Sequence, residues 1–223
     1  MTTDSSIERS VLADQVKDRL LQDILSGRYA PDSRIVETRV AKEVGTSQAP
    51  VREALRGLEA LGVVEILPFR GARVRRPSAT ELLEGYAVRA ELESLAVRLG
   101  IPAMTDADLA EIEELHQAMQ AAAKLGDRHE VAVRDAAFHA RIVQLARNGT
   151  LERVWRSLEP FSRTYITLAS PSADGQWTAD LHWPILRALQ ERDTAQVEQA
   201  LRYHFLQASE HLAADWREPQ KRD

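Results

Sequence analysis

The sequence predicts a mainly α-helical protein with two parts. Residues 1–77 are expected to form a winged helix-turn-helix with three helices and a β-hairpin wing, and residues 78–223 an all-helical bundle. Two observations carry this prediction. Apolar residues recur at helical spacing through most of the chain, and two short strand-like runs around a Pro- and Gly-containing turn follow the third helix. After residue 78 the sequence shows only helical patterns, which favours a bundle.

The elements of the first part follow the order of a winged helix-turn-helix. The predicted elements are helices at 7–25, 37–44 and 48–61 and strands at 63–67 and 72–75. Gly45 ends the second helix, and Thr46 or Ser47 is expected to cap the third. Pro68 and Gly71 mark the hairpin turn, which also carries a basic side chain, Arg70.

The second part is expected to hold six helices. They are predicted near 79–98, 105–125, 128–147, 150–169, 178–191 and 194–216. Ser78 and Glu81 have the spacing of a capping box, which places the start of the first of them. Asp193 and Gln196 mark the start of the last one in the same way.

Composition excludes several classes of protein. The chain has no cysteine, so disulfides and thiolate metal sites are excluded. It has no signal-peptide pattern and no apolar run long enough to span a membrane, so a cytoplasmic location is expected. The net charge of −5 conceals an asymmetry, because residues 1–77 hold 13 Lys and Arg against 11 Asp and Glu, and residues 78–223 hold 16 against 23. A slightly basic first part leaves DNA binding open.

The first part has the residue types of a DNA reader. In a helix-turn-helix the second helix enters the major groove with its N-terminal residues over the base edges. Here that end carries Ser47 and Gln48, with Arg52 one turn later. Gln can pair with adenine through two hydrogen bonds, and Arg can pair with guanine or hold a phosphate. The same side chains are also ordinary on exposed helix surfaces, so the pattern alone leaves both interpretations open.

The first part also resembles the GntR family of bacterial transcription factors. The similarity lies in PDSRIVE (31–37), VAKEVGTSQAPVREAL (40–55), LEALGVV (58–64) and FRGARV (69–74). It implies a homodimer that binds a pseudo-palindromic, double-stranded operator. The DNA-binding residues are expected to be Arg39, Ser47, Gln48, Ala49, Arg52, Arg70, Gly71 and Arg73. The family usually has Arg where this chain has Gln48, so that contact cannot be carried over, whereas Arg52 matches directly.

Four residues of the helical part could converge on a metal ion. Asp135 and His139 are four residues apart and face the same side of a predicted helix. His182 begins the next-to-last helix and His204 lies midway along the last. Imidazole and carboxylate ligands suit a divalent zinc, nickel, iron or manganese ion. From spacing alone, an Asp–His pair on the surface and isolated helical histidines remain the alternative.

The helical part resembles the FCD effector domain of the FadR-like branch of the GntR family. The matching segments are RAELE (89–93), DAAFH (135–139), LHWPILRAL (181–189) and ALRYHF (200–205). The last departs from the family pattern, with Leu201 and Phe205 in place of the usual Met and Leu. The resemblance implies that Asp135, His139, His182 and His204 are metal ligands. His116, His129 and His211 match no ligand position and are interpreted as ordinary helix residues. His211 follows His204 by one heptad and is the alternative ligand if the register of the last helix differs.

Two further residues are candidates for binding an effector. Arg89 could hold a carboxylate through two hydrogen bonds, with a salt bridge to Glu93 as the alternative. Asn148 is expected to cap the end of a helix beside Gly149, with a role in the effector pocket as the second interpretation.

Together these features predict a regulator, not an enzyme. The expected function is a repressor whose DNA binding responds to a small organic-acid effector bound beside the metal. One alternative is a regulator that senses the metal itself. Another is a helical metalloenzyme in which the Asp and His residues activate water. No partnered general base or nucleophile is evident in the sequence, and an enzyme would not explain the first part of the chain.

Overall fold

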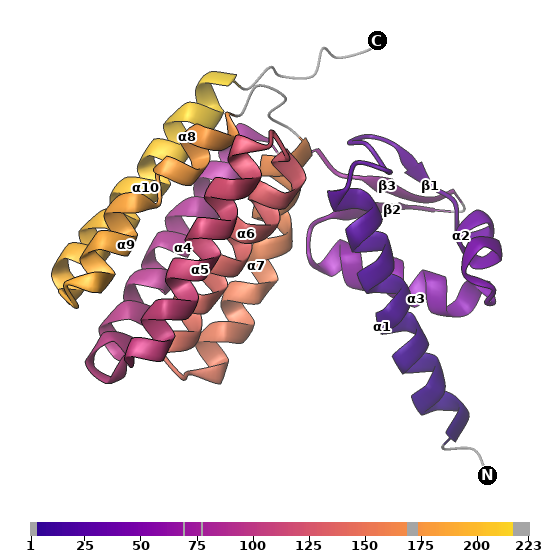
Figure 1. Cartoon of the computed structure of the whole chain (residues 1–223). Coiled ribbons are helices and arrows are strands. Elements are labelled where there is room, and N and C mark those ends of the chain that lie inside the picture. Colours follow the sequence, from indigo (N-terminus) through magenta and orange to yellow (C-terminus); the bar gives the residue numbers. More distant parts are fainter. Residues whose placement is uncertain (1–3, 69, 77, 169–173, 216–223) are drawn as a thin grey trace. The chain divides into compact units, whose positions relative to one another are not determined.

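The computed structural model describes residues 4–68, 70–76, 78–168 and 174–215 (Figure 1). The chain divides into two compact units, Met1–Arg76 and Pro77–Asp223. Phe69 and residues 169–173 and 216–223, where we expect part of the wing turn and the ends of two helices, lie outside the described residues. Among the described helices, none has the length and apolar character needed to cross a membrane.

The first unit is a winged helix-turn-helix, as predicted. Its elements are α1 (Asp4–Leu25), β1 (Arg34–Ile35), α2 (Glu37–Val44), α3 (Gln48–Ala60), β2 (Val64–Leu67) and β3 (Gly71–Val74). The strands form an antiparallel sheet in the order β1-β3-β2. The sequence did not predict β1, because a strand of two residues is too short to show an alternating pattern. Its Ile35 pairs with Ala72 and is fully buried.

The turn between α2 and α3 depends on a glycine. Gly45 adopts a left-handed φ of 72° and ends α2, with its N–H donating to the Ala41 carbonyl. Ser47 occupies the N-cap of α3, but its side chain makes no capping hydrogen bond. The prediction that Ser47 is the N-cap is therefore confirmed, but its hydroxyl does not accept a hydrogen bond from the first turn of α3. The first turn of α3 lies open to other acceptors.

The second unit is an all-helical bundle, as predicted. Its elements are α4 (Ala79–Gly100), the short 3-10 helix η1 (Ile101–Ala103), α5 (Asp106–Lys124), α6 (Arg128–Leu145), α7 (Gly149–Leu168), α8 (Gly175–Asp180), α9 (Trp183–Gln190) and α10 (Thr194–Asp215). The capping box of Ser78 and Glu81 at the start of α4 is confirmed. At the start of α10, Asp193 accepts from the Gln196 N–H at 3.1 Å, as expected.

The prediction of a single helix over residues 178–191 is wrong. Residues 178–191 form two helices, α8 and α9, separated by a turn at Leu181 and His182. Pro184 lies in the first turn of α9. Proline lacks an N–H, and its ring collides with the carbonyl four residues earlier in a continuous helix. The chain therefore turns before Pro184 and places His182 at the N-cap of α9.

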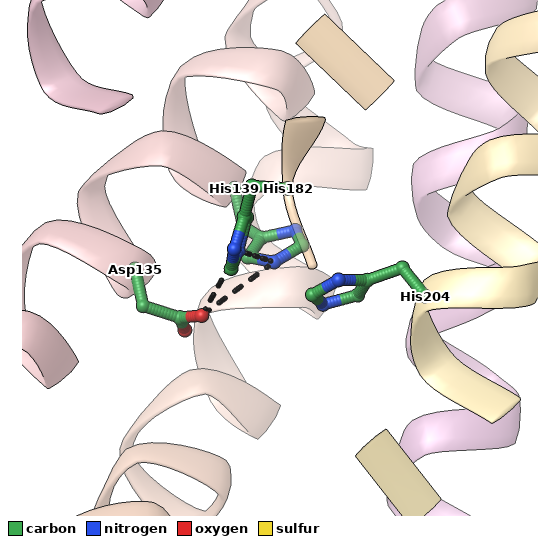
Figure 2. A group of neighbouring side chains, drawn as sticks. All are labelled: Asp135, His139, His182 and His204. Carbon is green, nitrogen blue, oxygen red and sulfur yellow. Dashed lines mark hydrogen bonds and ion pairs between the residues drawn. The ribbon is translucent and has the colours of Figure 1, made fainter. Parts of the chain in front are cut away.

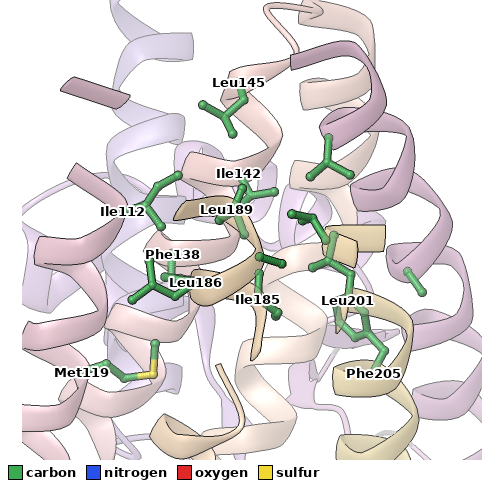
Figure 3. Close-up of a cluster of buried hydrophobic side chains, with 14 of the residues drawn as sticks. Ile112, Met119, Phe138, Ile142, Leu145, Ile185, Leu186, Leu189, Leu201 and Phe205 are labelled. Atoms are coloured by element: carbon green, nitrogen blue, oxygen red, sulfur yellow. The ribbon is translucent and has the colours of Figure 1, made fainter. Parts of the chain in front are cut away.

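A cluster of buried apolar side chains holds the bundle together (Figure 3). Ile112, Met119, Phe138, Ile142 and Leu189 are all fully buried in it. Each such side chain stabilises the fold by roughly 1.5–3 kcal/mol relative to an exposed one. Phe138 also lies edge-on to the rings of the next residue, His139, and of His182, so this core borders the polar cluster described below.

The close approach of β1 to β3 predicts a specific effect of Gly71→Ala. Gly71 has a φ of 84°, and a Cβ built there would lie 2.3 Å from the Ile35 carbonyl oxygen. We expect this variant to lose about 2–3 kcal/mol of unfolding free energy, measured by urea denaturation.

Gly45→Ala is the matched control. Its φ is 72°, but a Cβ there meets nothing within 4 Å. Only the backbone conformation is penalised, at about 1 kcal/mol. Equal losses in the two variants would contradict the close approach of β1 to β3.

Candidate DNA-binding face and buried Asp-His cluster

Three of the predicted DNA-binding residues lie at the exposed N-terminal end of α3. Ser47, Gln48 and Ala49 all face solvent there. The free N–H groups and the positive end of the helix dipole gather at the same place. This end of the helix can therefore accept a phosphate while Gln48 reaches a base edge.

Two predicted arginines beside this end are paired with acidic side chains. Arg52 on α3 donates from Nη2 and Nε to Glu37 of α2, at 3.0 and 3.2 Å, and remains 54% exposed. Arg39 of α2 donates to Glu43 at 3.0 Å. Exposed ion pairs of this kind contribute little to stability, so a DNA phosphate or base can replace the carboxylate.

A groove of about 490 Å³ lies between α3 and the wing hairpin of β2 and β3. Its lining contains four arginines, Arg34, Arg52, Arg56 and Arg70, and Glu37 is the sole acidic residue among the described lining residues. The Arg34 Nε donates to the Arg70 carbonyl at 2.5 Å, which ties β1 to the wing turn.

Arg34 and Arg56 line this groove but were not predicted from the sequence. Arg56 follows Arg52 by four residues, so helical spacing could have indicated it. Arg34 lies on the short strand that the sequence did not reveal.

The other two predicted wing contacts, Gly71 and Arg73, also help to form the hairpin. Arg73 of β3 pairs across the hairpin with Glu65 of β2, at 2.7 Å. Gly71 gives the close approach to β1 described above. Both remain predicted DNA contacts, but each also has a clear part in forming the hairpin.

In the second unit the structure brings the four predicted metal ligands together (Figure 2). They are Asp135 and His139 of α6, His182 at the α8–α9 turn and His204 of α10. One ligand atom from each lies within 4.8 Å of all the others, and all four side chains are buried. The His182 Nε2 lies 3.1 Å from the Asp135 carboxylate and 3.2 Å from the His139 Nε2.

Outer hydrogen bonds orient two of the imidazoles. The His139 Nδ1–H donates to Glu93 at 2.6 Å, and the His182 Nδ1–H donates to the Thr178 carbonyl at 2.8 Å. In this tautomer each Nε2 presents its lone pair to the centre of the cluster, which is the usual arrangement of metal-binding histidines.

The charge states of the other two side chains also suit ligands. Burial and the neighbouring His182 and His139 hold the pKa of His204 well below its usual value, so its ring is neutral. The His204 Nδ1 is buried and has no hydrogen-bond partner in the described part of the chain. Burial alone would raise the pKa of Asp135, but its contact with His182 and the nearby charges outweigh this and keep it a carboxylate.

These observations fit a divalent cation. Two inward lone pairs 3.2 Å apart, a carboxylate and a buried imidazole nitrogen without a partner lie together in this cluster. One cation would satisfy all four. Nitrogen and oxygen donors in this ratio suit zinc, nickel, iron or manganese.

Glu93 of α4 connects this cluster to its surroundings. Its carboxylate is fully buried and accepts hydrogen bonds from Arg89 at 3.0 and 3.2 Å, from His139, and from the Trp155 Nε1–H at 2.7 Å. Burial raises the pKa of Glu93, but its close contact with His139, the charge of Arg89 and these hydrogen bonds lower it by more. From the sequence, Glu93 was expected only as a salt-bridge partner of Arg89, and that salt bridge is confirmed.

A small cavity adjoins the cluster. It is lined by Tyr86, Arg89, Asp135, His139, Trp177, Thr178, Leu181, His204, Phe205, Ala208 and His211. Its volume is about 30 Å³, counted over the positions that the centre of a water molecule can take. That is room for about two waters, or for an ion and a small polar group. Arg89 therefore bonds Glu93 and borders the cavity at the same time.

Asn148 lies elsewhere. It is exposed, and its Oδ1 accepts from the N–H groups of Thr150 and Leu151, both at 3.1 Å. It thus caps the start of α7, and the expectation that it caps the end of the preceding helix is wrong. The free N–H groups at a helix start bind an Asn side chain more readily than a helix end does. Its predicted role in the effector pocket gains no support from this position.

Two other histidines also have defined surroundings. The His116 Nε2 bonds the Ala179 carbonyl at 3.2 Å, and burial lowers its pKa. His211 stacks on Trp177 and borders the cavity, which agrees with its position one heptad past His204, but it lies outside the four-residue cluster.

Each of the two units matches a known protein family. The family model "Bacterial regulatory proteins, gntR family" matches residues 12–74, and the "FCD domain" model matches residues 84–207. The chain belongs to the GntR family. It is a transcriptional regulator of the type that combines a GntR helix-turn-helix with an FCD domain. Members of this family bind operator DNA and typically dimerise.

Individual relatives of this GntR regulator extend the comparison. It is 34% identical to the "Probable D-xylose utilization operon transcriptional repressor" of Paenarthrobacter nicotinovorans, over 94% of this chain and 93% of the relative. It is 28% identical to the "HTH-type transcriptional repressor RspR" of Escherichia coli, over 95% and 94%. The solved structure of E. coli McbR/YncC has the same fold, with a TM-score of 0.81 at 24% identity, over 92% of this chain and 99% of that one.

The buried position of Glu93 predicts a large effect of Glu93→Gln. Loss of its charge removes the hydrogen-bonded counter-charge of the buried Arg89 guanidinium. We expect a loss of about 3 kcal/mol in unfolding free energy, measured by urea denaturation.

Glu91→Gln is the control on the same helix. Glu91 is exposed and pairs with Arg202 on the surface of the unit. We expect a clearly smaller loss, because surface pairs contribute little. If the two variants lose the same stability, Glu93 does not have the central role assigned to it.

Proposed function

We propose that this GntR regulator is a homodimeric repressor whose operator binding responds to a small carboxylate metabolite bound beside a divalent metal. One observation carries the proposal: three members of a buried group of one Asp and three His line a cavity together with a buried Arg, in a chain whose other unit is a winged helix-turn-helix. Two of the relatives named above, the P. nicotinovorans protein and RspR, are described as repressors, which supports this direction of regulation.

In this proposal α3 reads the operator. Its N-terminal end enters the major groove, where Gln48 pairs with adenine and Arg52 with guanine or a phosphate. The groove that joins α3 to the wing supplies further arginines for the backbone. Because Gln48 replaces the Arg that the family usually has, we expect an operator that differs from the common one at the base it faces.

The second unit is the proposed effector domain. Asp135, His139, His182 and His204 would hold the metal, and Glu93 would keep the His139 ring in place. When bound, the metal supplies positive charge and open positions for a carboxylate oxygen or water. Arg89, which borders the same cavity, is the proposed counter-charge for the effector.

Binding of the effector can then alter operator affinity. In a dimer the two recognition helices must lie about one DNA turn apart, so a small rearrangement of the dimer breaks their fit. The effector must bind the two states of the dimer with different affinities for this to happen.

A metal-sensing regulator is the second candidate. The cavity of about 30 Å³ accommodates an ion and water without any change in its walls, which favours the ion as the signal. The two candidates differ in one measurement. If removal of the metal releases the operator and no organic acid does so, the regulator senses the metal.

The DNA-binding proposal predicts the effect of Arg52→Ala. We expect specific affinity for an operator fragment from upstream of the gene to fall by about 10- to 100-fold, since one base or phosphate contact is lost. Gel shifts at two salt concentrations measure this, and specific binding should weaken as salt rises.

Arg98→Ala is the matched control for this experiment. Arg98 is an exposed arginine of α4 that pairs with Glu198 at 2.8 Å, as Arg52 pairs with Glu37. Its loss should leave DNA affinity unchanged. A fall of the same size in both variants, or no specific binding to any neighbouring intergenic fragment, would refute the assigned interface.

The metal proposal predicts the behaviour of the double variant His182→Ala, His204→Ala. The purified wild-type protein should carry about one metal ion per chain, and a chelator should lower its melting temperature, because the metal binds the folded state. The double variant should carry none and should not respond to the chelator. Elemental analysis and thermal unfolding measure both effects.

His129→Ala serves as its control. His129 lies on α6, outside the four-residue cluster, and should leave the metal content at the wild-type level. Metal retained at that level in the double variant would exclude the assigned ligands.

A further inference from the structure

The cavity beside the Asp-His cluster has a second polar residue at its edge. His211 of α10 stacks on Trp177 of α8, with ring centroids 4.1 Å apart and planes 24° from parallel. Both side chains line the cavity. The His211 Nε2 is buried and has no hydrogen-bond partner among the described residues.

The position of His211 separates it from the metal cluster. It follows His204 by seven residues on α10, so it lies two turns further along the same face, about 10 Å away at the Cα atoms. Phe205 and Ala208 line the cavity between them. The cavity therefore has one polar end at Arg89 and the cluster, an apolar middle, and a second polar end at His211.

The chemistry of His211 defines what it can contact. A buried polar atom without a partner is unfavourable, and such atoms in proteins generally bond to a ligand or water. Neutral imidazole has one donor and one acceptor nitrogen, so it can bind a hydroxyl or a carboxylate oxygen. The stack on Trp177 holds the ring in one orientation, which keeps that nitrogen in place.

We propose that His211 is the specificity-determining contact for the far end of the effector, and that Trp177 positions it. This inference rests on the proposed effector function of the cavity. The effector is then a short organic acid with a second polar group, either a hydroxyl or a second carboxylate. A simple aliphatic acid of the same length leaves His211 unpartnered and binds more weakly. The cavity has room for only about two waters as it stands, so an acid of this kind must be short and must displace side chains of the lining when it binds.

The test compares matched acids on the metal-loaded, full-length protein. The probes are succinate and malate, which have a second polar end, and butyrate, which has the same number of carbons and lacks one. Isothermal titration calorimetry gives the affinities. We expect at least one of the two bifunctional acids to bind about tenfold more tightly than butyrate, the usual effect of satisfying one buried hydrogen-bonding group.

The decisive variant is His211→Phe. Phenylalanine keeps an aromatic ring against Trp177 but has no ring nitrogen, so the preference should fall to about twofold or less while butyrate affinity stays the same. His211→Gln restores a polar group without the ring and should recover part of the preference. His129→Phe, outside the cavity lining, should keep the full preference. Metal content and circular dichroism verify that each variant is folded and loaded.

The outcomes separate this inference from the function on which it rests. If the acids bind and the preference persists in His211→Phe, His211 is not the contact, and the effector function stands. If wild-type protein binds metal and DNA but none of the acids, the proposed carboxylate-effector function fails and the role of His211 fails with it.

Discussion

The second unit depends on the fully buried carboxylate of Glu93. An isolated carboxylate in such a place is very unfavourable, and it persists here because three side chains from three helices donate to it. Arg89 supplies the counter-charge from α4, Trp155 donates from α7 and His139 from α6. The same bonds fix the direction of the His139 ring. One interaction thus joins helix packing to the orientation of the Asp-His cluster, and a change at the cluster can reach α4 and α7 through it.

The position of His182 in the cluster depends on the turn between α8 and α9. Pro184 stops α8 from continuing into α9, and the resulting turn places His182 where its Nδ1 meets the Thr178 carbonyl. A continuous helix over 178–191 would send this side chain in a direction set only by helical periodicity. The sequence predicted that His182 belongs with Asp135, His139 and His204, but this came from resemblance. The physical cause, a proline two residues after the histidine, was present in the sequence and was not used.

The sequence alone predicted the features that have a periodic or strongly local pattern. Helical periodicity located most of the helices, and Gly and Ser residues located their ends. The structure confirms the fold class predicted from them. What it missed depends on contacts between distant segments. β1 exists because Ile35 pairs with Ala72, and Glu93 is important because His139 and Trp155 donate hydrogen bonds to it. None of these contacts leaves a local pattern. Asn148 shows the opposite error, a true capping signal assigned to the wrong helix.

The two units place their charges in different environments, and this fits two different tasks. On the proposed DNA-binding face Arg52 and Arg73 are about half exposed, and such exposed ion pairs contribute little to stability, so a phosphate can replace their acidic partners. Such a face binds many sequences weakly and needs base contacts for selectivity. Arg89 and Glu93 are instead shielded from water, where each charge is strongly coupled to its neighbours. A new anion in that cavity must alter bonds to Glu93 or to the cluster, because little free volume and few unpaired groups remain there. The buried unit is therefore the part of this chain in which binding of a small ligand has the larger structural consequence.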